Sequence, residues 1–307
     1  MNLYTQKDKN IRRSYLLILG FLIFIIALGW YFSFALNSSI ILYIAVIFSV
    51  AMSFISYWYS DKIVLKMSGA REIAKKDSPE LYRIVENLAI TAGLPKPKIY
   101  IIEDKAMNAF ATGRDYKHSV VAVTKGLLQV LDKNELEGVI AHELSHIGNR
   151  DTLVSTIVVV LVGFVALISD FFIRMQIFGA PSSGILGRNK EGGGQIQMIL
   201  ILVGIILAIL SPIVAIIIKL SISRHREFLA DASGVLLTRY PEALASALQK
   251  ISLDNNRIKR ISKSTAHLFF SDPIHKLNSK NKSGWFGRLF MTHPSVEDRV
   301  KAIMNKG

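Results

Sequence analysis

Long uncharged apolar runs alternate with charged segments along this chain of 307 residues. The first run starts after Arg13 and reaches Asp61 without a charged side chain. One helix needs only about 20 residues to cross the hydrocarbon core of a bilayer, so this run has room for two crossings. The polar triplet 37–39 predicts the turn between spans over 15–34 and 40–58. A second span follows the first at once, so we expect a retained hairpin rather than a cleaved signal peptide.

Two further apolar runs follow in the second half of the chain. One of them precedes Asp170 and Arg174. Because a charge at the bilayer centre costs about 2.5–3.5 kcal/mol, these two residues belong at the far interface and the third span covers 153–173. The run over 198–218 predicts a fourth span, and the stretch 179–194, rich in glycine and serine, is expected to be a loop. The pattern therefore predicts a mainly α membrane protein with four transmembrane helices.

The segment 61–152 carries interspersed charges and is typical of a soluble domain. Strands are predicted over 98–102 and 119–124, with a turn-rich connection over 108–113 between them. The second of these strands is expected either to pair with an extended peptide at its edge or to pack inside the core. The sequence leaves both possibilities open.

Two amphipathic helices are predicted in the soluble parts. Pro79 opens one, which ends at Gly93, and the other covers 295–304. The chain is thus expected to divide into four parts: residues 1–60 with the tail and two spans, 61–152 with the first half of an α+β domain, 153–218 with two more spans and their loop, and 219–307 with the second half of that domain.

Composition agrees with a membrane protein. Hydrophobic residues make up 51% of the chain and the mean hydropathy is +0.37, which is too apolar for an ordinary soluble protein. The chain has no cysteine, which excludes disulfides and thiolate metal sites, so metal ligands have to be His, Asp or Glu. The net charge of +14 allows nucleic acid or anionic lipid as a partner. No nucleic-acid-binding motif accompanies the charge, which favours lipid headgroups.

Basic residues also predict the topology. They are concentrated in the N-terminal tail, after the second span and after the fourth, so the positive-inside rule assigns all three segments to the cytoplasm. Four crossings then bring the two halves of the soluble domain to the same membrane face, with both termini in the cytoplasm.

Candidate chemistry is concentrated at His142 and His146, with Glu143 between them. Asp132 and Glu135 predict a capping box that starts a helix before this motif. Residues four apart face the same side of a helix, so both imidazoles can bind one Zn²⁺ and the glutamate can take a proton from water. The alternative is a helix that carries two histidines by accident.

A third ligand is expected soon after the fourth span. Catalytic zinc takes three protein ligands, and Glu227 completes a set of two histidines and one glutamate. Asp231, one helical turn later, faces the same side and can accept a hydrogen bond from a ligating histidine. His225 is the competing ligand, but it lies on a different face from Asp231, so the geometry favours Glu227.

At this point the chain resembles the HtpX membrane metallopeptidases, which are relatives of the CAAX prenyl proteases within the gluzincins. The likeness covers nearly the whole chain. Besides the spans, it consists of the motifs Asn108-Ala-Phe-Ala-Thr-Gly, His142-Glu-x-x-His146, Ser-Arg-x-Arg-Glu227-Phe-x-Ala-Asp231 and Thr292-His293-Pro294. The segment 261–290 has no clear counterpart and leaves a lid or an insertion open.

The resemblance implies a cytoplasmic zincin-like metallopeptidase domain in the inner or plasma membrane of a prokaryote. It also implies ATP-independent, zinc-dependent endopeptidase activity on damaged or misassembled membrane proteins, as part of stress response and protein quality control. The roles that it implies are His142, His146 and Glu227 as zinc ligands, Glu143 as base, Asp231 as a residue behind the ligands, His293 and Arg299 on the oxyanion side, and Asn108 as a contact to the substrate backbone.

Without the resemblance, His293 is better explained as a residue of a helix-capping region, and Arg299 as a solvated helix charge. Two other kinds of protein stay open. An intramembrane protease of the site-2 type carries its motif inside a span, whereas here the motif lies among charged residues. A membrane scaffold with structural zinc needs no base, so the intact Glu143 counts against it. The sequence leaves the substrates and the oligomeric state open.

Overall fold

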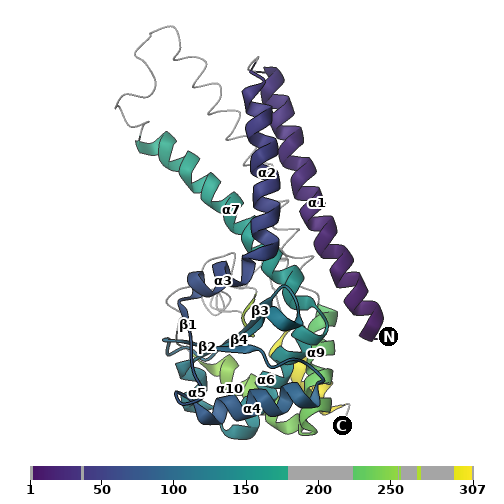
Figure 1. The fold of residues 1–307 in the computed structure, drawn as a ribbon. Coiled ribbons are helices and arrows are strands. Elements are labelled where there is room, and N and C mark those ends of the chain that lie inside the picture. Colours follow the sequence, from purple (N-terminus) through teal and green to yellow (C-terminus); the bar gives the residue numbers. More distant parts are fainter. Residues whose placement is uncertain are drawn as a thin grey trace.

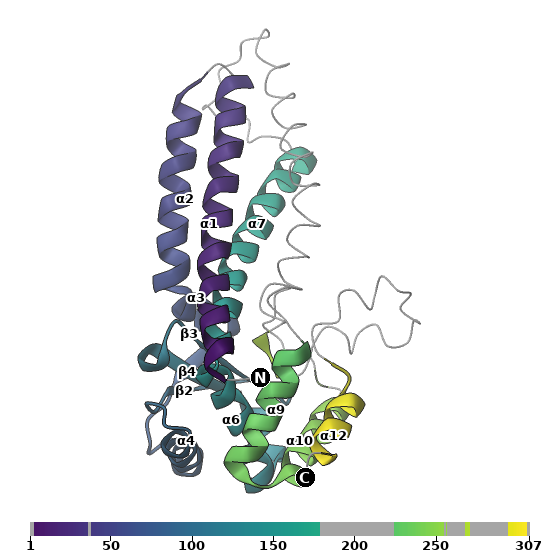
Figure 2. The same ribbon diagram turned by 90° about the vertical axis from the view of Figure 1, so that its right-hand side faces the viewer.

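The computed structural model describes residues 3–35, 38–178, 224–254, 256, 268–270 and 294–305. Within these residues the chain is mostly helical and contains a small mixed sheet. Figures 1 and 2 show three long helices that extend from a lobe holding the sheet and the shorter helices. Both ends of the chain lie at the lobe. The long helices are α1 (Leu3–Ala35), α2 (Ile40–Trp58) and α7 (Asp151–Phe178).

The helices α1 and α2 are each long and apolar enough to cross a membrane, over Asp8–Tyr31 and Ile40–Trp58. A third crossing results if α7 and the bent helix before it count as one span. The predicted hairpin agrees with this pair, although α1 begins well before the expected residue 15. Large apolar side chains on both helices point outward, as a lipid-facing surface requires: Leu16, Leu19, Ile23, Trp30, Ile40, Ile44, Ile47 and Phe54. The predicted fourth span and the loop over 179–194 lie outside the described residues.

The sheet has the strand order β1-β2-β4-β3. The central pair β2–β4 is parallel, and the other two pairs are antiparallel. Both predicted strands are present as β2 and β4, whereas β1 and β3 were not predicted. The strands are β1 (Ala70–Glu72), β2 (Lys98–Ile102), β3 (Ala109–Gly113) and β4 (Ser119–Thr124).

The prediction of a turn-rich connection over 108–113 is wrong. Residues Ala109–Gly113 form β3, all five are buried, and they pair with β4 from Ala109↔Val123 to Gly113↔Ser119. Alanine and glycine are poor strand formers, so local propensity did not indicate a strand, and pairing and burial in the core decide the conformation instead. Because β4 lies between β2 and β3, its sides are both occupied. Among the described residues, β3 is therefore the edge strand at this end of the sheet.

The helices of the lobe surround α6 (Lys133–Gly148), which carries the histidine motif and is almost entirely buried. Helix α10 packs closely on it, because Gly138 leaves no side chain between α6 and the backbone of Leu244. The remaining helices are α3 (Ser60–Ser68), α4 (Pro79–Thr91), α5 (Lys125–Val130), a short 3₁₀ turn (Tyr116–His118), α9 (Arg224–Thr238), α10 (Pro241–Leu253) and α12 (Val296–Met304). Helix α4 begins at the predicted Pro79, and α12 agrees with the predicted helix over 295–304.

A sharp bend of 82° joins α6 to the start of α7. At the bend Arg150 has φ 60°, a left-handed conformation that is uncommon for a residue with a side chain. Its guanidinium stacks on the Tyr116 ring, 3.6 Å from the centroid, and donates to the Arg114 carbonyl at 3.3 Å. These contacts hold the bend, so the end of the histidine helix lies at the foot of α7.

Candidate metal centre

Two elements that are far apart in sequence supply the three candidate ligands. His142 and His146 project from α6, whose start is fixed by the predicted capping box. Glu227 lies on α9, which crosses α6 closely because a Cβ at Gly234 would come within 3.1 Å of the His142 backbone nitrogen. One donor atom from each ligand lies within 4.8 Å of the other two. The structure therefore brings together the three residues that the sequence nominated.

The separations suit a single metal ion. The Nε2 atoms of His142 and His146 are 3.1 Å apart, and Glu227 oxygens lie 3.9 and 3.6 Å from them. Two atoms bound at about 2.0–2.2 Å to one tetrahedral ion lie about 3.3–3.5 Å from each other. Two imidazoles and one carboxylate are also the donor types of catalytic zinc sites. These residues fit such an ion without large rearrangement.

A carboxylate faces the second nitrogen of each imidazole. His142 Nδ1 lies 2.9 Å from Asp231 Oδ1, and His146 Nδ1 lies 3.0 Å from Asp151 Oδ2. Each ring therefore donates through Nδ1 and presents Nε2 to the cluster. The sequence predicted Asp231 as a hydrogen-bond partner of a ligating histidine, whereas it predicted no such role for Asp151. The only available signal was its position five residues after His146, at the start of the third span.

The Arg299 guanidinium binds Asp231 through two hydrogen bonds. Nε donates to Oδ2 at 2.9 Å and Nη2 donates to Oδ1 at 2.6 Å, and the arginine side chain is 2% exposed. Burial alone would raise the pKa of Asp231, but the charge of Arg299 and the hydrogen bonds from Arg299 and His142 lower it to about 2. Asp231 is thus held as an anion behind the His142 ring, and Arg299 is no solvated helix charge.

The two histidines differ in charge. Burial lowers the pKa of His142 to about 4, although Asp231 opposes this. Burial acts in the same direction on His146, but the hydrogen bond to Asp151 and the charge of Glu227 outweigh it and raise the pKa to about 9. At neutral pH a proton on His146 therefore competes with a metal ion.

Glu143 is buried beside the ligands. Burial raises its pKa to about 7, the Glu227 charge adds to the rise, and the backbone N–H of Ala111 in β3 opposes it. A carboxyl group with a pKa near the working pH can both accept and return a proton.

Comparison with known proteins identifies the chain. The family model of Peptidase family M48 matches residues 75–306, a range that includes the three candidate ligands and the residues that contact them in this site. This chain belongs to peptidase family M48. It is therefore a metallopeptidase, a hydrolase that cleaves peptide bonds, and its apolar helices make it a membrane protein.

The relatives of this M48 peptidase cover almost its full length. It is 41% identical over 305 residues to a protein named "Protease HtpX homolog" from Thermoanaerobacter pseudethanolicus, which spans 98% of this chain and 97% of the relative. A protein of the same name from Tropheryma whipplei is 43% identical over 288 residues, with 93% of both chains covered. The crystal structure of S. mikatae Ste24p shares the fold, with a TM-score of 0.50 and 19% identity over 98% of this chain and 67% of that one.

One wall of the M48 site is aromatic. The Phe270 and His142 rings pack edge to face with centroids 4.9 Å apart, and the Arg299 guanidinium lies over the Phe270 ring, 4.8 Å from its centroid. The Phe270 N–H donates to the Ala109 carbonyl of β3 at 2.9 Å. Phe269 and Phe270 lie in the segment 261–290, for which the sequence left a lid or an insertion open, and the structure buries both side chains.

The remaining candidates of the M48 site divide as follows. Asn108 is buried at the start of β3, where its side-chain oxygen accepts from the Ala109 N–H at 3.0 Å. His225 is exposed on α9 and does not belong to the cluster of donors. His293 lies outside the described residues. The helix that follows it is capped by Ser295, whose hydroxyl accepts from the Asp298 N–H at 3.1 Å.

Proposed function

We propose that this M48 peptidase is a zinc endopeptidase with His142, His146 and Glu227 as ligands and Glu143 as general base. The observation that carries the proposal is the convergence of three donor atoms while a carboxylate orients each imidazole from behind. Structural zinc sites are usually closed by four protein ligands. Three ligands with a buried carboxylate next to them suit catalysis better.

Each residue then has a defined task. A zinc ion held by these three ligands would supply Lewis-acid chemistry, which polarises the scissile carbonyl and makes water more acidic. Glu143 takes the proton of the attacking water and later delivers it to the leaving amine. Asp231 and Asp151 keep the two imidazoles oriented throughout.

Substrate binding is proposed along β3, the edge strand of the described sheet, beyond the Ala109 carbonyl that accepts from Phe270. An extended peptide can add to this edge strand, and Asn108 at its start would contact the peptide backbone. We keep His293 and Arg299 as oxyanion-side residues. Arg299 uses Nε and Nη2 on Asp231, and its Nη1 donates to the Phe270 carbonyl at 3.4 Å and forms an ion pair with Glu227 at 3.9 Å.

Misfolded or damaged membrane proteins are the proposed substrates, cleaved at the cytoplasmic face of a prokaryotic inner or plasma membrane. The site supports this proposal because its histidine helix ends at the foot of α7 and extends from there into the lobe. The relatives named HtpX homologs support it as well. Four spans, cytoplasmic termini and the division at residues 60, 152 and 218 belong to the same proposal.

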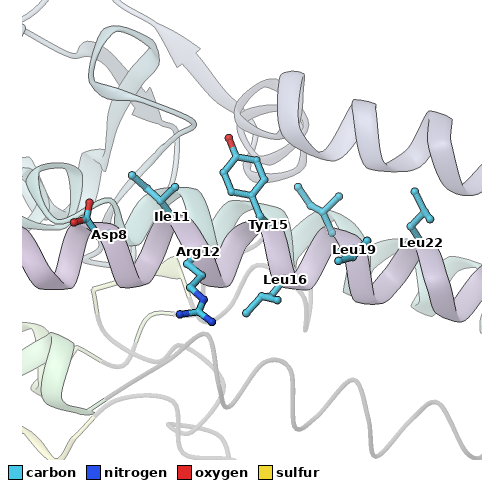
Figure 3. A pocket seen from close by; sticks show the side chains of 8 residues that line it. Asp8, Ile11, Arg12, Tyr15, Leu16, Leu19 and Leu22 are labelled. Atoms are coloured by element: carbon cyan, nitrogen blue, oxygen red, sulfur yellow. The ribbon is translucent and has the colours of Figure 1, made fainter.

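Anionic lipid is the proposed partner of α1. A groove on this helix lies apart from the metal cluster and is lined by Asp8, Ile11, Arg12, Tyr15, Leu16, Ile18, Leu19 and Leu22. Figure 3 shows Arg12 and Leu16 on the same side of the helix. An arginine next to apolar side chains suits a negatively charged headgroup with its acyl chain below.

Glu143→Gln tests the catalytic assignment. The variant should keep one zinc per chain and lose peptide hydrolysis by about 10²- to 10⁴-fold, because the amide cannot take the proton. Zinc is measured by metal analysis of the purified protein, and hydrolysis by casein cleavage in detergent with and without a chelator. Glu137→Gln on the same helix is the matched control and should cleave at the wild-type rate. A Glu143→Gln protein that cleaves as fast as wild type would remove Glu143 from the mechanism.

A further inference from the structure

Asn10 lies in the polar N-terminal part of α1, yet its side chain is 0% exposed. Its neighbours Asp8 and Arg12 are exposed. The Asn10 amide nitrogen donates to the Asn149 carbonyl at 2.9 Å and to Asp151 Oδ1 at 2.7 Å. Both partners only accept hydrogen bonds, so the group that faces them has to be the NH₂ of the amide. A residue of the first membrane helix thus contacts the carboxylate that faces His146.

Four helices meet at the Asp151 carboxylate. Asp151 is the first residue of α7, and its Oδ2 faces His146 of α6. Its Oδ1 accepts from Asn10 of α1 and from Arg226 Nη1 of α9 at 3.4 Å. Asp151 and Arg226 are buried as well. The two oxygens therefore have different partners: Oδ1 binds α1 and α9, and Oδ2 binds the candidate ligand.

A carboxylate with one free oxygen can rotate about its Cβ–Cγ bond, and donors on Oδ1 remove that freedom. We propose that Asn10 is a positioning residue of the metal centre, which fixes Asp151 so that Oδ2 receives the Nδ1–H of His146. The inference rests on the proposed function, in which His146 is a ligand. It makes the first membrane helix a part of the metal site as well as an anchor.

Helix packing does not require this amide. Farther along the helix, Ile18 and Phe21 of α1 pack on a buried apolar cluster of α7 that contains Leu153 and Ile157. That contact already holds the two helices together. Burying an amide costs free energy unless its hydrogen bonds are made, so an apolar residue would serve packing alone better than asparagine. The amide has a separate task, and among the described residues the charged partner that it binds is Asp151.

The test compares full-length variants in detergent by two readouts: the zinc dissociation constant from chelator competition, and the visible absorption spectrum after cobalt substitution. Replacing a partner behind a ligand costs about 10- to 100-fold in metal affinity, which is expected for Asp151→Asn. Asn10 is one hydrogen bond farther away, so Asn10→Leu should weaken zinc binding by about three- to tenfold and alter the cobalt spectrum.

Phe21→Ala is the matched control, because it loosens the same helix contact without touching Asp151 and Phe21 does not line the groove proposed for lipid. It should lower the thermal midpoint but leave zinc affinity and the cobalt spectrum as in wild type. The double variant Asn10→Leu/Asp151→Asn should bind zinc no more weakly than Asp151→Asn alone, because the two residues act in one chain.

The inference is overturned by any of three results: Asn10→Leu has the zinc affinity and the cobalt spectrum of wild type, Phe21→Ala weakens zinc binding as much as Asn10→Leu does, or the losses of the two single variants add in the double variant. Should Asn10→Leu not fold, Asn10→Ser takes its place under the same criteria. A wild-type protein that binds no zinc would instead overturn the proposed function, so the two failures are distinguishable.

Discussion

At the residue scale, charge pairing behind the ligands organises the site. Arg299 keeps Asp231 ionised, and Asp231 orients His142. Asp151 orients His146 in the same way, and its hydrogen bond favours a proton on that ring when no metal is present. Each carboxylate thus defines which ring nitrogen points into the cluster. The ligands owe their geometry to residues that do not belong to the His-Glu-x-x-His motif.

The choice of third ligand gives a prediction at this scale. Glu227→Ala should lower zinc affinity by more than about tenfold, because it removes one of three donor atoms. His225→Ala should leave affinity unchanged, since His225 is exposed and lies outside the cluster. Zinc bound per chain after dialysis against a weak chelator measures both. The reverse result would reassign the ligand.

At the element scale, the first turn of α6 is stabilised from two sides. Asp132 and Glu135 form the capping box, and the Glu135 carboxylate also accepts from Ser246 at 2.6 Å and Lys250 at 2.7 Å of α10. Burial of Glu135 would raise its pKa, but the hydrogen bonds from Lys250 and Ser246 outweigh it and lower the pKa. One carboxylate therefore starts the histidine helix and joins it to α10.

Glu135→Gln should lower stability at neutral pH by about 1 kcal/mol, the usual cost of losing a helix cap. A lowered pKa stabilises the fold at pH values above the ordinary carboxyl range, and this contribution disappears as the pH falls through the folded-state pKa. The difference between variant and wild type should therefore shrink below about pH 4. Thermal midpoints at several pH values measure this difference.

Glu137→Gln is the control, because it loses a surface pair with Lys133. It should stay within a few tenths of a kcal/mol of wild type. An equal loss of stability in both variants would contradict the role of Glu135.

At the scale of the whole molecule, the lobe and the long helices define two ends. The turn between α1 and α2 lies at the end away from the lobe, and α7 leads from the lobe toward that same end (Figure 1). Helix α9 belongs to the lobe again and supplies Glu227. The apolar run over 198–218 is long enough to cross the bilayer, and it is the fourth span of the proposed topology.

Single cysteines can test this topology cleanly, because the chain has none of its own. Ser39→Cys in the turn before α2 and Ser183→Cys after α7 should react with a membrane-impermeant maleimide in intact cells. Lys76→Cys in the lobe should react only after permeabilisation. If Ser183→Cys reacts only after permeabilisation, as Lys76→Cys does, the result contradicts four crossings.

The sequence alone determined what depends on short spacings and long apolar runs. The capping box, the shared face of His142 and His146, and the helix over 40–58 follow from local periodicity, and the structure agrees with each. Glu227 and Asp231 were nominated by the same i,i+4 rule, and Arg299 and Asn108 only by resemblance.

Only the tertiary structure decided what depends on residues far apart in sequence. β3 is a strand because β4 pairs with it, against the local preference of alanine and glycine. Asp151, Arg299 and Asn10 acquire their partners across 5, 68 and 141 positions. The contact of Asn10 carries no local signal, because a buried amide and a solvated one look the same in a sequence. Burial and hydrogen bonding become visible only after the helices have packed.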